Sequence, residues 1–176
     1  MKLDLSEIAR TIGMHAVHEV DEPCPEELGV ECVSPIRGRI EFSNTGSLLL
    51  IEGGIEAEVR LQCSRCLVDF TLPVEAPVQE EFRLAKVGDA VRVLPMDGED
   101  GSAELVSNNF LDVQELVRQN LLLVMPIQPL CRPDCRGLCP TCGENLNMRE
   151  CACPPAEPES PLQALAQLLN EGSTDT

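Results

Sequence analysis

Apolar and polar side chains alternate strictly along residues 55–63, IEAEVRLQC, and this pattern constrains the fold more than any other feature of the chain. A period of two is typical of a strand with one buried and one exposed face, as in antiparallel sheets. The alternation returns in residues 68–74 and 78–84. There Pro73 and Pro77 indicate a bend or a sheet edge, because proline cannot donate to a ladder. These three stretches predict consecutive antiparallel strands.

Two further strand candidates precede them. Residues 36–42 and 48–51 supply large apolar side chains for earlier strands, and residues 44–46, Asn-Thr-Gly, predict a turn between the two. We therefore expect an antiparallel meander over residues 30–84. Only 2% of the chain is aromatic although 43% is apolar, so the core must consist mainly of Leu, Val and Ile.

A helix is predicted after this meander. Asp112-x-x-Glu115 matches the N-terminal capping pattern, in which a short oxygen acceptor precedes a carboxylate that reaches back to the first amide. The apolar residues that follow at intervals of three and four form one helical face: Val113, Leu116, Val117, Leu121 and Val124. Pro126 disfavours helical geometry at the residue before it and ends the helix. We expect this helix to cover the sheet.

The remaining segments complete the expected organisation. Residues 1–29 show loose helical spacing followed by an acidic, proline-bearing stretch, and residues 85–109 are expected to be a flexible connection. We predict an α+β fold over residues 1–126, an antiparallel β-meander or partly open barrel covered by one or two helices. A small zinc-knuckle module is expected over residues 127–157, and a last amphipathic helix with a tail over residues 158–176.

Six of the ten cysteines lie within residues 131–153. At the centre of this cluster, Cys139-Pro140-Thr141-Cys142-Gly143 predicts a knuckle, a tight turn from which two thiolates reach one ion while backbone amides donate to the sulfurs. Gly143 permits the left-handed backbone that such turns often require. A tetrahedral Zn²⁺ site needs two more ligands. Either of two pairs supplies them: Cys151 with Cys153, or Cys131 with Cys135.

A structural zinc site is favoured over disulfides or idle buried thiols. The N-terminal sequence MKLDLSEIAR lacks the apolar core of a secretory signal, so we expect a cytoplasmic protein with reduced thiols. No apolar run approaches the roughly 20 residues that span a bilayer, and no membrane association is expected. Four thiolates around Zn²⁺ leave no open coordination position, so the site is expected to stabilise the chain rather than to catalyse.

Cys63 and Cys66 form another pair, between two predicted strands. By parity both thiols point to the apolar face at a hairpin tip. A redox CxxC motif would instead open a helix whose N-terminus lowers a thiol pKa. Three interpretations remain: half of another zinc site, packing behind a metal site, or two small buried hydrophobic residues. Four other potential ligands are expected to lie outside any metal site: Cys24, Cys32, His15 and His18.

The charge of the chain limits its partners. Thirty acidic and 13 basic residues give a net charge of −17, which repels phosphate backbones at long range and favours basic partners. Between residues 131 and 153, three arginines balance three acidic side chains. We find no phosphate-binding loop, no glycine-rich dinucleotide turn and no nucleophile elbow in the sequence, and we expect no enzymatic activity.

Three stretches resemble the bacterial YceD family, known as large ribosomal RNA subunit accumulation proteins: CSRC at 63–66, LVMPIQPLC at 123–131 and DCRGLCPTCGENLNMRECAC at 134–153. The resemblance spans roughly residues 30–170, and CxRC is the most widespread cysteine feature of that family. It implies a non-enzymatic factor in ribosome biogenesis that supports accumulation of large-subunit ribosomal RNA. The implied partners are that RNA or a basic large-subunit ribosomal protein.

Two other functions compete with this expectation. One is a zinc-knuckle adapter unrelated to ribosomes, which would dock proteins through its last amphipathic helix. The other is a thiol-based redox enzyme, disfavoured because the Cys63–Cys66 pair lies between strands. The number of zinc ions and the oligomeric state are left open by the sequence.

Overall fold

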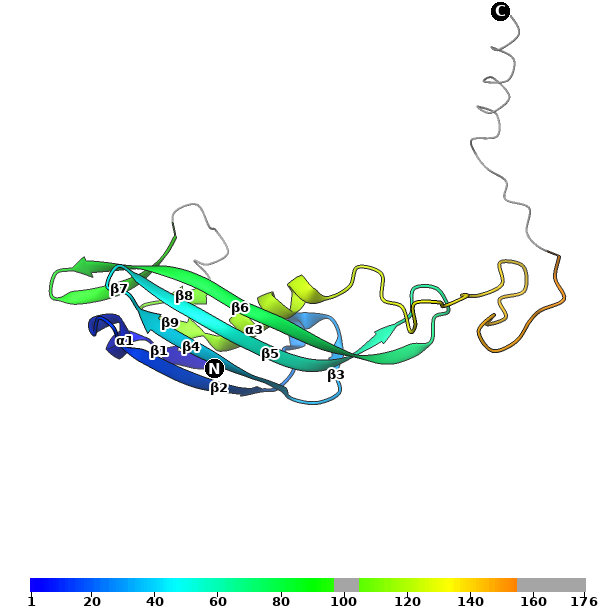
Figure 1. Cartoon of the computed structure of the whole chain (residues 1–176), viewed down its shortest axis with the longest axis horizontal. Helices are drawn as coiled ribbons and strands as arrows, with labels where there is room; N and C mark the ends of the chain where they lie inside the picture. Colours follow the sequence, from blue (N-terminus) through cyan, green and yellow to red (C-terminus); the bar gives the residue numbers. More distant parts are fainter. Residues whose placement is uncertain (97–104, 155–176) are drawn as a thin grey trace, which may run out of the picture. The chain divides into compact units, whose positions relative to one another are not determined.

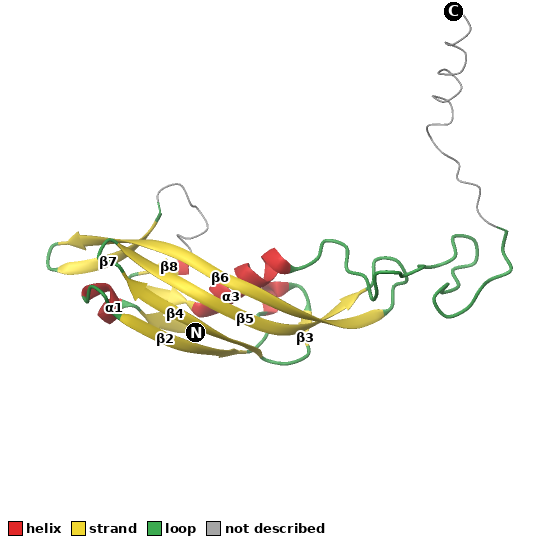
Figure 2. Cartoon of the chain, in the orientation of Figure 1, coloured by secondary structure: helices red, strands yellow, loops and turns green. Residues whose placement is uncertain are grey.

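The computed structural model describes residues 1–96 and 105–154 (Figure 1). In its described residues the chain divides into two compact units, one of Met1–Ser64 with Val68–Cys131, and one of Arg65–Leu67 with residues 132–154. Antiparallel strands dominate the first unit and helices are few (Figure 2). The prediction of an α+β fold built on an antiparallel sheet is confirmed at this level.

The main sheet has six strands, in the order β2-β4-β5-β6-β7, with β3 paired to β5 outside this path. Their bounds are β2 (His15–Glu22), β3 (Glu31–Cys32), β4 (Ile36–Asn44), β5 (Leu48–Gln62), β6 (Asp69–Val87) and β7 (Ala90–Pro95). Every pairing is antiparallel. The meander expected over residues 30–84 corresponds to β4-β5-β6, and β7 extends it.

Strand β5 is longer than the sequence predicted. The expected strands at 48–51 and 55–63 belong to one strand of 15 residues, because Gly53 and Gly54 continue the ladder to both neighbours. The turn before β5 was predicted correctly, since the Gly46 amide donates to Asn44 Oδ1 at 2.7 Å there.

The two prolines of β6 lie at a partial sheet edge. Strand β7 pairs with β6 only from Phe82 to Val87, whereas Pro73 and Pro77 lie where β5 is the neighbour in the ladder. Their missing amide protons therefore leave the pairing to β7 intact. The prediction of an edge at these residues is confirmed.

Two predictions for irregular segments were wrong in part. Residues 1–29 contain the strands β1 (Lys2–Asp4) and β2, with only a short helix α1 (Ser6–Arg10) and a 3₁₀ turn η1 (Glu26–Leu28). Residues 85–109 contain the end of β6, all of β7 and part of a second sheet rather than only a connection. That three-stranded antiparallel sheet has the order β1-β9-β8, with β8 (Val106–Ser107) and β9 (Phe110–Asp112).

Helix α3 (Val113–Val124) has the predicted extent and ends before Pro126. Asp112 Oδ1 accepts a hydrogen bond from the Glu115 amide at 3.3 Å, which confirms the cap. The Glu115 carboxylate serves a different purpose from the predicted one. It accepts from Arg118 Nε at 2.8 Å and Nη2 at 2.6 Å, and this hydrogen bonding lowers the pKa of Glu115.

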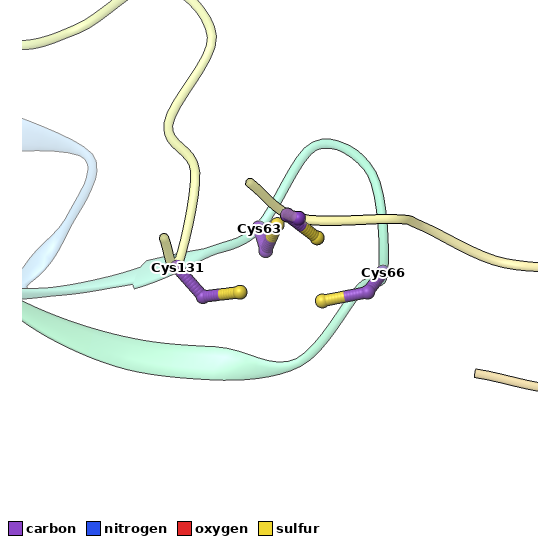
Figure 3. Close-up of side chains that lie close together, drawn as sticks. Cys63, Cys66 and Cys131 are labelled. Atoms are coloured by element: carbon purple, nitrogen blue, oxygen red, sulfur yellow. The ribbon is translucent and has the colours of Figure 1, made fainter. Parts of the chain in front are cut away.

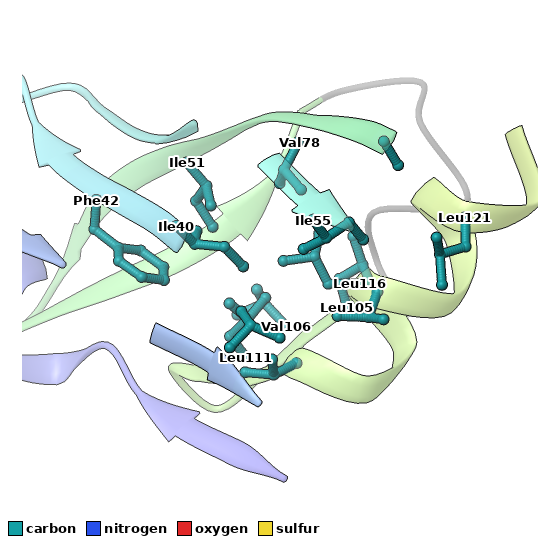
Figure 4. Close-up of a cluster of buried hydrophobic side chains, with 14 of the residues drawn as sticks. Ile40, Phe42, Ile51, Ile55, Val78, Leu105, Val106, Leu111, Leu116 and Leu121 are labelled. Carbon is teal, nitrogen blue, oxygen red and sulfur yellow. The ribbon is translucent and has the colours of Figure 1, made fainter. Parts of the chain in front are cut away.

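One hydrophobic cluster in the described residues joins the inner face of the main sheet to α1, α3 and the small sheet (Figure 4). Helix α3 packs against β6, as the sequence predicted for a helix that covers the sheet. The largest fully buried side chains are Phe42, Phe82, Leu5, Ile36, Ile40, Leu49, Ile51, Ile55, Leu105, Leu111, Leu116 and Leu121. Aliphatic residues therefore dominate this core.

No helix in the described ranges is long and apolar enough to cross a membrane. The amphipathic helix expected within residues 158–176 lies outside the described residues.

Candidate metal centres

The structure gathers eight of the ten cysteines into two groups of four. The knuckle group consists of Cys139, Cys142, Cys151 and Cys153, and the hairpin group of Cys63, Cys66, Cys131 and Cys135. Within each group all four sulfurs lie within 4.8 Å of one another. Four sulfurs that converge in this way are the donor set of a tetrahedral site, so each group could hold a metal ion.

The knuckle group is built on the turn that the sequence predicted. The Gly143 amide donates to Cys139 O at 2.9 Å, and the Cys139 amide donates to Glu144 O at 2.8 Å. Gly143 has a φ of +75°, the left-handed conformation expected for the residue after the second cysteine. Cys151 and Cys153 bring the third and fourth sulfurs to this turn.

Hydrogen bonds distribute charge unequally among the knuckle thiols. Those from the backbone amides of Cys142 and Thr141 lower the pKa of the Cys139 thiol to about 6. The side-chain hydrogen bond with Cys142, together with desolvation, raises the pKa of Cys153 to about 12. Thiolates this close oppose one another's ionisation. A bound cation removes that opposition, because it deprotonates the thiols that coordinate it.

In its described residues, the second unit has almost no apolar core. In its segment 132–154 the buried residues are Cys135, Gly137 and Cys139. Leu138 and Leu146 are only half-buried, and Met148 is 80% exposed. Apolar burial therefore contributes little to the stability of this segment. A metal ion bound by its cysteines would supply enough free energy to order the segment instead.

The hairpin group is more deeply buried than the knuckle group. Cys63, Cys66 and Cys135 are 0%, 4% and 2% exposed, and Cys131 is half-buried. Figure 3 shows the side chains of Cys66 and Cys131 pointing toward each other, with Cys63 beside them. Of the two pairs that the sequence offered to complete the knuckle site, the structure places only Cys151 with Cys153 there. The other pair lies with the hairpin.

Comparison with known proteins identifies the family. Residues 51–169, more than half of the chain, match the sequence profile described as "Large ribosomal RNA subunit accumulation protein YceD". The chain belongs to the YceD family. The matched region contains both cysteine groups.

Individual relatives cover most of this chain. A maize chloroplast protein named "Large ribosomal RNA subunit accumulation protein YCED homolog 1" is 27% identical over 165 residues, 80% of this chain and 56% of its own length. An uncharacterised Mycobacterium tuberculosis protein is 28% identical over 151 residues, 81% of this chain and 69% of its own length. The uncharacterised Bacillus subtilis protein YlbN is 25% identical over 116 residues, 66% of this chain and 63% of its own length. No solved structure matches the chain.

Polar side chains that sequence reasoning missed support the cysteine segments of this YceD protein. Asn147 Nδ2 donates to Cys135 Sγ at 3.3 Å, and Asn147 Oδ1 accepts from the Arg136 amide at 2.7 Å. Arg65 Nη1 donates to Cys135 O at 2.9 Å. Polar residues within a cysteine-rich stretch were visible in the sequence, but their spacing does not indicate which sulfur or carbonyl each one contacts.

The four residues expected outside any metal site all lie outside the two groups. Cys24 and Cys32 are joined by a disulfide, with Cα atoms 5.6 Å apart. The expectation of reduced thiols is therefore wrong for this pair, because spacing alone does not show that two cysteines eight residues apart are brought together across the 3₁₀ turn η1. His15 lies on β2, where its Nδ1 is 2.8 Å from Ser43 Oγ, and His18 lies on the same strand.

Proposed function

We propose that this protein is a non-enzymatic ribosome-biogenesis factor that supports the accumulation of large-subunit ribosomal RNA. The observation that carries this proposal is the match of residues 51–169 to the YceD family, whose description names that role. The name of the maize relative describes the same role for that protein. The fold alone would not support the assignment, because one fold serves many functions.

A structural Zn²⁺ in the knuckle group is part of the proposal. The convergence of four sulfurs, the amide hydrogen bonds toward Cys139 and the lack of an apolar core in segment 132–154 support it. Zn²⁺ is the ion that four thiolates in knuckle spacing hold most commonly. Four protein ligands leave no coordination position for a substrate, which agrees with a factor that is not an enzyme.

The proposed partner is a basic protein of the large ribosomal subunit, met in the cytoplasm. A net charge of −17 attracts a basic chain and repels the phosphates of RNA. Direct binding to large-subunit RNA is the other outcome of the tests below.

Depletion of the protein in the organism that encodes it tests the proposed role. We expect large-subunit ribosomal RNA to fall relative to small-subunit RNA, measured by electrophoresis of total RNA. Expression of the intact chain should restore the ratio. A ratio that stays normal after depletion would contradict the proposed role.

Affinity capture of the tagged full chain, with and without ribonuclease, tests the partner. Large-subunit proteins that remain after ribonuclease treatment would support direct protein binding, whereas their loss would point to RNA as the contact. Capture without any large-subunit component would instead favour the adapter alternative.

A further inference from the structure

Only one of the two cysteine groups is accounted for by the knuckle motif. The hairpin group combines a CxxC pair with Cys131 and Cys135, which lie 65 or more residues further along the chain. Two cysteine pairs so far apart in sequence do not converge through local spacing. Their convergence therefore needs a physical cause of its own.

The turn between β5 and β6 places the first pair. The Cys63 amide donates to Val68 O at 2.9 Å and closes this turn. Leu67 within it adopts a φ of +59°, a left-handed conformation that is uncommon for a residue other than glycine. The geometry leaves Cys63 and Cys66 almost fully buried, as the parity of the strands predicted.

Hydrogen bonds from the same turn hold the segment that carries the second pair. The amide and Oγ of Ser64 both donate to Pro129 O, at 2.8 and 3.1 Å, two residues before Cys131. Arg65 Nη1 donates to Cys135 O at 2.9 Å. Gly137 passes so close that a Cβ atom there would lie 3.2 Å from Arg65 O. The backbone around each cysteine pair is therefore positioned by contacts with the segment that carries the other cysteine pair.

The surroundings of the sulfurs suit thiolates rather than thiols packed as hydrophobic residues. Asn147 Nδ2 donates to Cys135 Sγ at 3.3 Å, and a sulfur that accepts such a bond is better suited to carry negative charge. A small hydrophobic residue in place of Cys135 would leave that amide without its sulfur acceptor. Four thiolates, three of them on buried residues, would repel one another strongly unless a cation lay among them.

We infer that Cys63, Cys66, Cys131 and Cys135 bind a second structural Zn²⁺, independent of the knuckle site, so that each chain carries two ions. This second ion fastens the β5–β6 turn to the segment around residues 129–137. The inference concerns the hairpin group only, and it stands or falls separately from the ribosomal role. Under this inference Cys63 and Cys66 supply half of a zinc site, which is the first of the three interpretations that the sequence left open.

Metal analysis of the purified full chain tests the inference. We expect two zinc ions per intact chain, one in the C63S/C66S variant and one in the C139S/C142S variant. The matched control is C24S/C32S, which also removes two sulfurs but should keep both ions. An intact chain with one ion, lost only in C139S/C142S, would overturn the inference.

Two further measurements cover a C63S/C66S variant that does not fold. Titration of the metal-free intact chain with Co²⁺ should give two equivalents, each with the absorption of tetrahedral thiolate coordination. Saturation at one equivalent would refute a second site. Alkylation of the chain as isolated, in denaturant without reductant, followed by mass spectrometry, should also find all four hairpin-group cysteines as thiols. Disulfides among them would refute it equally.

Discussion

At the scale of single residues, Asn147 connects the backbone of the second unit to a proposed ligand. Its side chain donates to Cys135 Sγ, accepts from the Arg136 amide and donates to Asn145 Oδ1 at 2.9 Å. An amide held from both ends in this way is a positioning group: it orients the sulfur and favours its charged form.

Replacement of Asn147 should therefore weaken one zinc site and leave the other unchanged. We expect Asn147→Ala to lower the affinity of the hairpin group for Zn²⁺ about 10- to 100-fold, the usual cost of losing a group that supports a ligand. Competition with a chromophoric chelator measures the two affinities. Met148→Ala is the control, because that neighbouring side chain is 80% exposed. Equal affinities in Asn147→Ala and the intact chain would show that the contact to Cys135 is incidental.

Residue-level predictions succeeded where a short motif determines the backbone. The left-handed Gly143 and the cap at Asp112 both follow from local chemistry. The roles of Asn147 and Arg65 do not, because their partners depend on which distant segments meet. The sequence could name eight candidate cysteines, but only the folded chain assigns Cys131 and Cys135 to the hairpin rather than to the knuckle.

At the scale of elements, the alternating pattern predicted strands well when the inner face was apolar. Strand β2 was missed because its inward positions are mixed: Ala16, His18, Val20 and Glu22. Polar residues on the inner face erase the period-two signal, although the backbone still pairs with β4 over eight residues. Sheet pairing, which hydropathy does not encode, overrides the pattern there.

The pairing of β4 with β5 depends on glycine in a way that adjacent positions can test. A Cβ atom on Gly53 would collide with Arg39 O and lie 2.9 Å from Ile40 Cα, whereas one on Gly54 would only come within 4.0 Å of Ala76 O. We expect Gly53→Ala to lower the free energy of unfolding by about 2 kcal/mol or more, because backbone atoms cannot move aside easily. Gly54→Ala, the matched control, should change it by less than about 1 kcal/mol.

Urea denaturation followed by circular dichroism compares the two variants. Similar midpoints for Gly53→Ala and Gly54→Ala would mean that β4 and β5 separate readily at this point, and the close approach would then have no energetic consequence.

At the scale of the whole molecule, the two units draw on different sources of stability. The first has a cluster of buried aliphatic side chains, while in the described part of the second the buried residues are three cysteines and a glycine: Cys66, Cys135, Cys139 and Gly137. Periodicity could predict the first unit because apolar burial determines it. The second could be predicted only as a ligand pattern, since its conformation depends on turns and sulfurs rather than on a hydrophobic face.

This contrast predicts that the knuckle group can be disabled without unfolding the sheet. A structural zinc ion contributes about 10 kcal/mol or more of binding free energy, far more than the half-buried Leu138 and Leu146 supply. In the C139S/C142S full chain, we expect the amides of Gly143 and Leu146 to exchange with solvent rapidly. Those of β4, β5 and β6 should keep the protection they have in the intact chain.

Hydrogen exchange measured by NMR distinguishes the outcomes, with C24S/C32S as the control that should preserve protection in residues 132–154. If Gly143 and Leu146 stay protected in C139S/C142S, the turn hydrogen bonds suffice without the cation and zinc is not what orders the segment. If β4–β6 lose protection as well, the core of the first unit is not self-sufficient. If zinc takes the place of a hydrophobic core in this segment, the C139S/C142S variant should lose amide protection in the knuckle segment alone.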